Sequence, residues 1–221
     1  MFSIAIDGPA GAGKSTIAKL VAKELEIAYL DTGALYRGIG YYLNEKKVDV
    51  LKEEKVKEAI ASYKVQLAFE EKQPQIYVND SNVTAYLRTE EVGNIASKIA
   101  TYSCIREKLL SVQQETAKKM DVVMDGRDIG TNVLPNANLK IYLTASVSER
   151  ANRRYKELVE KGESCDIAKI EADIKARDKQ DMQREIAPLR QAEDAILIDS
   201  SQMTIDEVVE QIVKEAKERK E

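Results

Sequence analysis

The residues whose spacing points most clearly to chemistry lie close to the N-terminus. A glycine, four further residues and then Gly-Lys-Ser form the pattern of a P-loop, in which backbone N–H groups surround the phosphates of a nucleotide. An apolar run at residues 3–6 precedes the pattern and a helical stretch at 16–25 follows it, which is the context that the motif requires. We therefore expect a nucleoside triphosphate to be bound by Gly8, Pro9, Ala10, Gly11, Ala12, Gly13, Lys14, Ser15 and Thr16.

Within this loop each residue type has a physical role. Glycines let the backbone N–H groups turn towards phosphate oxygens without a clash from a Cβ atom, and the helix N-terminus adds a partial positive charge. Lys14 has the length to reach the β and γ phosphates, and Ser15 can hold Mg²⁺. The alternative interpretation of the pattern is a glycine-rich turn with an exposed lysine that binds no phosphate. A Rossmann site is excluded, because the glycines do not follow G-x-G-x-x-G.

Polar residues follow the other apolar runs, at the carboxyl ends where ligands gather in a parallel sheet. Thr32 and Arg37 begin a helix after the second run, where a second phosphate can rest. Arg127 follows the third run and can bind a phosphate through two parallel hydrogen bonds. Asp125 ends that run as a carboxylate suited to orient Mg²⁺ or its water. For each of these groups a structural salt bridge at the edge of the sheet is the alternative.

Two later clusters of charge fall on predicted helices. The first turns of a helix after the fourth run carry three arginines, Arg150, Arg153 and Arg154. They suit a lid that closes over the transferring phosphates, and a solvated basic face is the alternative. Arg177, Asp181 and Arg184 share one face of another helix. An arginine there can contact phosphate while Asp181 accepts from a ribose hydroxyl. A ladder of ion pairs within the helix fits the same spacing.

The elements that must position these groups follow from the hydrophobic pattern. Five short apolar runs lack polar alternation, as strands buried on both faces do, and lie at 3–6, 28–30, 122–124, 139–143 and 195–198. Helical stretches separate them. The sequence therefore predicts an α/β fold of the P-loop NTPase type over residues 1–221, with a five-stranded parallel sheet flanked by helices. An Arg-rich helical lid is expected at about 148–166.

One segment does not follow this alternation of apolar runs and helical stretches. Residues 63–85 alternate apolar and polar side chains and predict a small antiparallel β-meander, between helices near 52–61 and 90–118. We expect this insertion, at about 38–104, to form a second lobe, although a surface hairpin has the same pattern. Near the C-terminus, Thr204 and Glu207 form a capping box at the start of an amphipathic helix.

The bulk composition narrows the function. The chain has 221 residues, a net charge of −4 and no histidine. The acidic balance argues against nucleic acid as a partner, and the missing histidine removes the commonest general base. Two widely spaced cysteines, no targeting segment and no apolar run near the roughly 20 residues of a membrane span lead us to expect a cytoplasmic protein without a membrane partner. We also expect a monomer.

A chain without histidine suits one kind of phosphoryl transfer in particular. A hydroxyl acceptor needs a carboxylate that takes its proton, whereas the attacking oxygen of a nucleoside monophosphate is already ionised at neutral pH. Such a reaction needs cations that offset the repulsion between two polyanions, and a dry site that positions them. We therefore expect direct in-line transfer, without a covalent intermediate and without a general base.

These motifs resemble those of the bacterial-type cytidylate kinases, which are P-loop nucleoside monophosphate kinases. The resemblance extends over nearly the whole chain, and its most specific pieces lie at 8–16, 30–37, 125–131 and 186–189. It implies ATP with Mg²⁺ as the donor and CMP or dCMP as the acceptor. It also implies that the 63–85 meander belongs to an enlarged monophosphate-binding insertion. Asn152 departs from the resemblance, because it interrupts the arginine run of the lid.

The resemblance further implies roles for individual residues. The acceptor would be contacted by Thr32, Arg37, Ser97, Arg106, Arg127, Asp128, Arg177, Asp181 and Arg184. Within this set, Arg127 and Arg184 would bind the phosphate and Asp181 would bind the ribose. The cytosine would be bound by Ser97, Arg106 and Asp128. Ser97 and Arg106 rest on the resemblance alone. The groups expected to act in catalysis are Lys14, Arg127, Asp128, Arg153 and Arg184.

Two other functions remain open from the sequence. The same scaffold can transfer phosphate to UMP, dTMP or a non-nucleotide acid, because spacing does not reveal the preferred base. A nucleotide-dependent switch protein is the second alternative. It is disfavoured because the chain has no Asn-Lys-x-Asp motif and no glycine three residues after Asp125.

Overall fold

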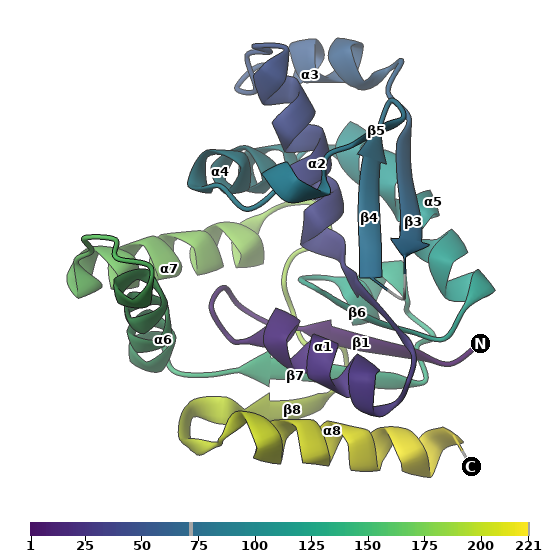
Figure 1. Cartoon of the computed structure of the whole chain (residues 1–221), viewed down its shortest axis with the longest axis vertical. Coiled ribbons are helices and arrows are strands. Elements are labelled where there is room, and N and C mark those ends of the chain that lie inside the picture. Colours follow the sequence, from purple (N-terminus) through teal and green to yellow (C-terminus); the bar gives the residue numbers. More distant parts are fainter. Residues whose placement is uncertain (71–72, 221) are drawn as a thin grey trace. The chain divides into compact units, whose positions relative to one another are not determined.

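The computed structural model of the protein describes residues 1–70 and 73–220, so residues 71 and 72 of the expected β-meander lie outside the described residues (Figure 1). The chain forms two compact units. One unit contains Met1 and Ile27–Val122, and the other contains Phe2–Glu26 and the chain from Val123 onward. Each unit contains residues that the sequence assigns to phosphate binding.

A five-stranded parallel sheet carries the phosphate-binding loop. Its strands, in the order β2-β6-β1-β7-β8, are β2 (Ala28–Asp31), β6 (Val122–Gly126), β1 (Ser3–Asp7), β7 (Leu139–Thr144) and β8 (Ile196–Asp199). β1 pairs in parallel with β7, with Ile4 opposite Leu139, and β7 pairs in parallel with β8. All residues of β1 are buried, as expected for a central strand covered on both faces. The sheet predicted from the apolar runs is therefore confirmed.

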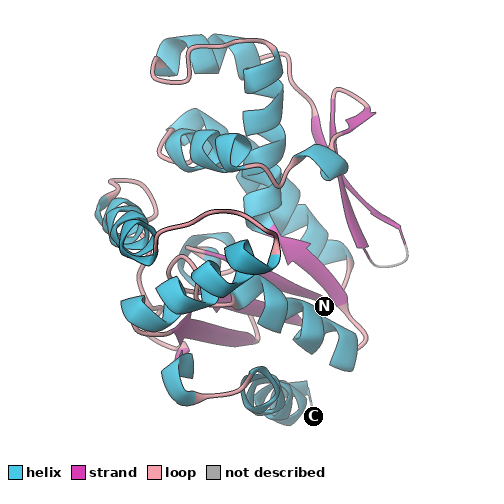
Figure 2. Cartoon of the chain, turned by 60° about the vertical axis from the view of Figure 1, so that its left-hand side comes forward, coloured by secondary structure: helices cyan, strands magenta, loops and turns pink. Residues whose placement is uncertain are grey.

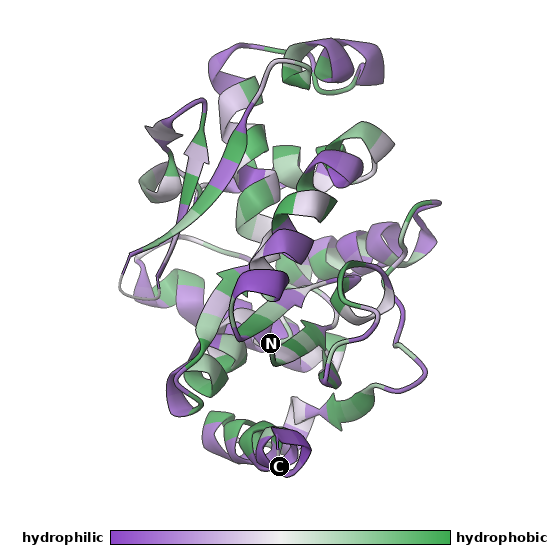
Figure 3. Ribbon diagram, turned by 90° about the vertical axis from the view of Figure 1, so that its right-hand side faces the viewer, coloured by the Kyte–Doolittle hydropathy of each residue, from purple (hydrophilic) through white to green (hydrophobic). Residues whose placement is uncertain are grey.

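Four helices belong to the same unit as β1. They are α1 (Lys14–Glu24), α6 (Val147–Glu160), α7 (Ile167–Gln183) and α8 (Ile205–Lys220). α8 packs against α1 and β7, and α6 packs against α7 (Figure 1). α8 carries both hydrophobic and hydrophilic segments, consistent with one face on the sheet and one in water (Figure 3). Its start is fixed by the predicted capping box, in which the Glu207 N–H donates to Thr204 Oγ1 at 3.2 Å and the Thr204 N–H donates to Glu207 Oε2 at 2.8 Å.

The other unit contains the β-meander that the alternating pattern predicted. β3 (Val65–Glu70), β4 (Gln73–Val78) and β5 (Ser81–Asn82) form a separate antiparallel sheet, whose strands are drawn in magenta in Figure 2. Asn79 and Asp80 turn the chain from β4 to β5 with φ angles of 49° and 65°, a conformation that these two residue types tolerate. The sheet packs against α2 (Thr32–Glu45) through Ile76, which is 1% exposed. This packing gives the unit a hydrophobic core of its own.

The helix expected at 90–118 is instead two helices, so that expectation was wrong. α4 (Glu90–Ile99) and α5 (Ser103–Lys119) are separated at Tyr102, whose backbone is extended. The hydroxyl of Tyr102 donates to Val50 O at 2.9 Å, and its ring is buried. This tertiary contact, together with the turn at Thr101, breaks a stretch whose helical periodicity continues in the sequence. The neighbouring α3 (Glu53–Ile60) agrees with the prediction for 52–61.

Three short helical turns complete the described structure. They are η1 (Thr84–Tyr86), the π-helical η2 (Ile129–Val133) and η3 (Ser200–Gln202). η2 and η3 begin just after the carboxyl ends of β6 and β8, at the edge of the sheet from which the phosphate-binding loop also emerges. Across residues 1–70 and 73–220, no helix has the length and apolar character needed to cross a membrane.

Candidate active site

The loop at residues 8–13 connects β1 to α1 and has a conformation that glycine makes possible. A Cβ atom on Gly8 would lie 1.9 Å from the backbone oxygen of Leu143 on β7, so no larger residue fits there. Gly13 precedes the first residue of α1 and has a φ of 86°, in the left-handed region that glycine adopts without strain. The strand–loop–helix context that the P-loop pattern required is therefore present in the structure.

Lys14 lies at the start of α1 and is only 6% exposed. Its Nζ donates to Pro9 O at 2.8 Å, within the loop. Burial, together with the positive charge of Arg127, lowers the pKa of Lys14 to about 7, although Asp125, Asp7 and Asp181 oppose the shift. The lysine of the loop thus lies within electrostatic reach of Arg127 and Asp181, which the sequence assigns to the acceptor.

Ser15 and Asp125 form an oxygen-rich contact beside the loop. The Ser15 hydroxyl donates to Asp125 Oδ2 at 2.9 Å, and Asp125 is 4% exposed at the end of β6. A hydroxyl and a carboxylate are ligands that fit Mg²⁺. Among the described residues no three Asp, Glu, His or Cys side chains gather in one place, so a cation here would need phosphate oxygens and water for its remaining ligands.

Asp7 is a buried carboxylate at the carboxyl end of β1. Its Oδ1 accepts from the Ile129 N–H and its Oδ2 from the Gly130 N–H, both at 2.7 Å. Burial raises the pKa of Asp7 to about 6, although the two amide hydrogen bonds lower it. Asp7 thereby fixes η2 against the end of β1, and η2 directly follows Arg127 and Asp128.

Four of the predicted acceptor residues form a connected charged cluster. The Arg127 Nε donates to Asp181 Oδ2 at 2.7 Å, and Asp181 Oδ1 lies 3.9 Å from Arg184 Nη1. The Arg184 Nη2 in turn donates to Asp128 Oδ1 at 3.0 Å. The side chains of Arg184 and Asp128 are 5% and 8% exposed, whereas that of Arg127 is 22% exposed. The structure thus brings these four residues together at the end of β6 and the end of α7.

The spacing of Arg177, Asp181 and Arg184 does not produce a simple ladder on one helix face. Asp181 bonds to Arg127 from another segment, and Arg184 lies just past α7 with an extended backbone. Its Nε donates to Ala187 O at 2.6 Å, which anchors the side chain to the following turn. Arg177 lies on the exposed side of α7.

The other four predicted acceptor residues belong to the unit that contains α2. Asp31 caps α2 by accepting from the Ala34 N–H and forms a 2.6 Å ion pair with Arg37. Arg106 is 6% exposed and donates to Ala100 O at 3.2 Å, and its guanidinium lies over the Tyr36 ring. The remaining two are Thr32, buried in the first turn of α2, and Ser97, half-buried on α4.

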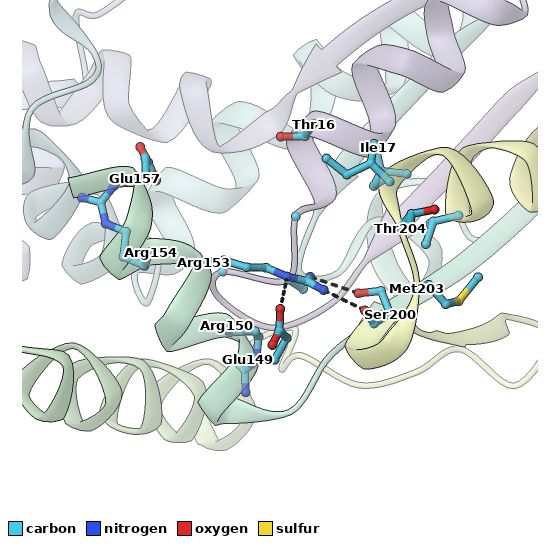
Figure 4. Close-up of a pocket in the computed structure, with 15 residues that line it drawn as sticks. Thr16, Ile17, Glu149, Arg150, Arg153, Arg154, Glu157, Ser200, Met203 and Thr204 are labelled. Atoms are coloured by element: carbon cyan, nitrogen blue, oxygen red, sulfur yellow. Dashed lines mark hydrogen bonds and ion pairs between the residues drawn. The ribbon is translucent and has the colours of Figure 1, made fainter. Parts of the chain in front are cut away.

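The three arginines expected to line a lid have three different environments. Arg150 is 4% exposed and is bound to Asp178 and to backbone oxygens, so the alternative of a solvated basic face is wrong for this residue, and its place in a lid stays a prediction. Arg153 donates through Nε to Glu149 and through Nη2 to Ser200 O at 2.7 Å (Figure 4). Arg154 forms an exposed ion pair with Glu157.

A pocket of about 500 Å³ lies beside the phosphate-binding loop. Its walls come from the loop, α1, α6, η3 and the start of α8, as Figure 4 shows for ten of its residues. Lining residues that the sequence did not single out include Glu149, Met203, Ile205 and Val208. Ser200 and Met203 follow the carboxyl end of β8, so the rule that ligands gather at strand ends is the signal that predicts their position.

Comparison with known proteins agrees with this geometry. A family model described as Cytidylate kinase matches residues 4–218. The cytidylate kinases of Bacillus thuringiensis (strain Al Hakam) and Bacillus anthracis (strain A0248) are each 46% identical over 211 residues, covering 96% of this chain and 94% of each relative. A crystal structure of an uncharacterized protein from Eubacterium ventriosum ATCC 27560 shares the fold with a TM-score of 0.54 at 13% identity, covering 98% of this chain and 99% of that chain. The resemblance noted in the sequence is therefore confirmed, and the chain belongs to the cytidylate kinase family.

Proposed function

We propose that this protein transfers the γ-phosphate of ATP to CMP or dCMP, giving ADP and the nucleoside diphosphate. The transfer is direct and in line, with no covalent intermediate. Membership of the cytidylate kinase family supports this reaction. Since both substrates are soluble nucleotides, we also propose that the protein acts in the cytoplasm, as a monomer.

The observation that carries the proposal is the hydrogen bond that joins the start of α1 to the end of β6. The Ser15 hydroxyl donates to Asp125 Oδ2 at 2.9 Å, and Asp125 lies two residues before Arg127. Arg127 in turn donates to Asp181 of α7 at 2.7 Å. The phosphate-binding loop is therefore linked to two residues that we assign to the acceptor, as a reaction between the two bound phosphates requires.

On the donor side, the chain supplies backbone N–H groups, one ammonium group and a pocket. The backbone amides that follow Ala10, up to the start of α1, bind the phosphate oxygens, and Lys14 neutralises charge on the β and γ phosphates. The neighbouring 500 Å³ pocket is large enough for a nucleoside and is lined partly by apolar side chains. We assign the adenosine of ATP to this pocket.

On the acceptor side, arginines bind the phosphate and polar side chains select the nucleoside. We assign Arg127 and Arg184 to the acceptor phosphate and Asp181 to the ribose. Asp128, which holds Arg184 in place, contributes to the choice of cytosine. The remaining proposed contacts are Thr32, Arg37, Ser97, Arg106 and Arg177. Of these residues, Ser97 would be carried by the insertion at about 38–104, and α6 with the turn after it would form the lid at about 148–166.

A divalent cation completes the proposed donor site. We propose that Ser15 holds Mg²⁺ and that Asp125 contacts it through water, because the two side chains already lie 2.9 Å apart. When bound, Mg²⁺ would neutralise part of the charge on the β and γ phosphates.

No side chain has to remove a proton in this reaction. The acceptor oxygen of CMP is ionised at neutral pH, so the residues of the chain act by positioning and by neutralising charge. Arg153 lies close enough to the loop for a Cβ on Gly13 to be 3.9 Å from its Nη1. We propose that Arg153 exchanges its bonds to Glu149 and Ser200 for the transferring phosphate.

A panel of acceptors tests the proposed function. The purified protein with Mg²⁺ and ATP is incubated with CMP, dCMP, UMP, dTMP, AMP or no acceptor, and ADP release is measured. We expect the highest kcat/KM with CMP or dCMP. Faster turnover of dTMP or AMP would contradict the assigned acceptor, and tight ATP binding with no turnover on any acceptor would favour a binding protein. Lys14→Ala, which removes the ammonium group, should reduce turnover by several orders of magnitude.

A further inference from the structure

Ala10, in the middle of the phosphate-binding loop, has both of its backbone polar groups bound by a single buried ion pair. Its N–H donates to Asp178 Oδ1 at 3.1 Å, and its carbonyl oxygen accepts from Arg150 Nη1 at 2.7 Å. The same Nη1 donates to Asp178 Oδ2 at 2.7 Å. The loop is therefore tied at one residue to α6, which carries Arg150, and to α7, which carries Asp178.

The ion pair is buried to a degree that requires compensation. Arg150 and Asp178 are 4% and 8% exposed, and removing two charges from water costs several kcal/mol per ion unless good hydrogen bonds satisfy them. Here the hydrogen bonds go to Ala10 and, through the Arg150 Nε at 2.9 Å, to Ala145 O. The hydrogen bonds that offset the cost of burying this ion pair therefore form only when the loop is in this position.

The loop residue after Ala10 packs against the same two helices. A Cβ atom on Gly11 would lie 3.4 Å from the Cβ of Arg150 on α6 and 3.8 Å from the Cδ1 of Ile174 on α7. Ile174 lies one helical turn before Asp178. Two successive loop residues are therefore fixed by α6 and α7, one through hydrogen bonds and one through close packing.

We propose that Asp178, acting through Arg150 and Ala10, is a positioning residue that holds the phosphate-binding loop in its binding conformation before nucleotide arrives. Because the Ala10 N–H points to Asp178, the amides after Ala10 supply the phosphate contacts. A loop that is already ordered binds tightly, since the apparent dissociation constant equals the intrinsic one divided by the fraction of molecules in the competent conformation. This inference deepens the proposed donor site and rests on it.

The test compares two variants of Asp178 with a matched control. Asp178→Ala removes both hydrogen bonds, whereas Asp178→Asn keeps an acceptor for the Ala10 N–H and loses the carboxylate. Asp194→Ala is the control, because it breaks an ion pair to the buried Lys140 that does not involve the loop. Binding of MgADP and of CMP is measured separately by isothermal titration calorimetry, and hydrogen–deuterium exchange is followed in peptides that cover residues 8–13.

We expect the Asp178 variants to weaken MgADP binding by about tenfold to a hundredfold, the range that corresponds to losing one hydrogen bond to a charged group. Asp178→Asn should fall between the wild type and Asp178→Ala. Exchange in the loop peptides should accelerate in both variants and not in Asp194→Ala. CMP binding should stay within about twofold of the wild type, because the lost bonds act on the loop.

Two results would overturn the proposal. One is a folded Asp178→Asn or Asp178→Ala that binds MgADP as tightly as the wild type. The other is an equal loss of MgADP and CMP affinity, which would indicate a general structural role. If Asp178→Ala does not fold, Asp178→Asn decides the outcome. These measurements use no acceptor turnover, so a failure of the acceptor panel would leave the result on the loop intact.

Discussion

The buried ammonium group of Lys14 provides a direct way to test how the loop binds nucleotide. Burial lowers the pKa of Lys14 to about 7, so the free protein loses much of this charge above neutral pH. A triphosphate placed against Nζ favours the charged form and raises the pKa again. We therefore expect nucleotide binding above neutral pH to be accompanied by uptake of a proton on Lys14.

The size of this uptake follows from the pKa. With a pKa of about 7, roughly one-tenth of Lys14 is protonated at pH 8, so binding should take up about 0.9 proton there and about 0.5 at pH 7. A lysine with its ordinary pKa of about 10.4 would already be charged and would take up almost none. The terminal phosphate, with a pKa near 6, is ionised at pH 8 and contributes little.

Calorimetry in several buffers measures the uptake. A non-hydrolysable ATP analogue with Mg²⁺ is titrated into the protein at pH 8 in buffers of different ionisation enthalpy, and the slope of observed enthalpy against buffer enthalpy gives the number of protons. Lys14→Arg is the control, because a guanidinium stays charged and its slope should be near zero. A slope below about 0.2 for the wild type at pH 8 would refute a depressed Lys14 pKa in the free protein.

Three further substitutions test other parts of the structure. Arg127→Lys should lower kcat/KM for CMP by about tenfold to a hundredfold in steady-state assays, because an ammonium cannot form two parallel hydrogen bonds, and unchanged kinetics would contradict its role. Gly8→Ala should lower the free energy of unfolding in urea by about 1–3 kcal/mol, because the new Cβ would meet Leu143 O at 1.9 Å. The control Gly93→Ala places a Cβ with no atom within 4 Å and should raise the free energy of unfolding by up to about 1 kcal/mol. Asp7→Asn should leave one of two buried N–H groups without an acceptor and lower the free energy of unfolding by about 1–3 kcal/mol. Burial raises the pKa of Asp7 to about 6, so between pH 7 and pH 5 the folded protein binds a proton on Asp7 that the unfolded chain does not yet bind. The wild type should therefore gain stability relative to Asp7→Asn as the pH falls from 7 to 5. A parallel change in the stability of both proteins would contradict this assignment.

The sheet and the phosphate-binding loop were predictable because local sequence determines them. Runs such as residues 3–6 and 139–143 are short and lack polar alternation, which is typical of strands buried on both faces. The loop was predictable because a Cβ on Gly8 would clash with Leu143 O and because Gly13 has a backbone conformation that residues with side chains rarely adopt. The β-meander followed from period-two alternation and a turn at residues 79–80.

The contacts between distant segments were not predictable from spacing. Asp181 pairs with Arg127, which is 54 positions away, instead of with a neighbour on its own helix. Arg150 looked like a surface cation because it lies among charged residues, yet it is bound to Ala10, 140 positions away. The break at Tyr102 likewise depends on Val50, 52 positions away. Each of these pairings becomes apparent only when the fold has brought the partners together.

The ion pairs of the proposed acceptor residues also determine how an anion can enter. Arg37, Arg127 and Arg184 each rest against a carboxylate of the chain itself, at Asp31, Asp181 and Asp128. An incoming phosphate must therefore displace a resident counter-charge or share the guanidinium with it. Phosphate binding is then an exchange of one ion-pair partner for another, so its affinity should depend less on ionic strength than binding by unneutralised arginines would. The exchange should also discriminate against small anions, which make too few contacts to displace the resident carboxylates.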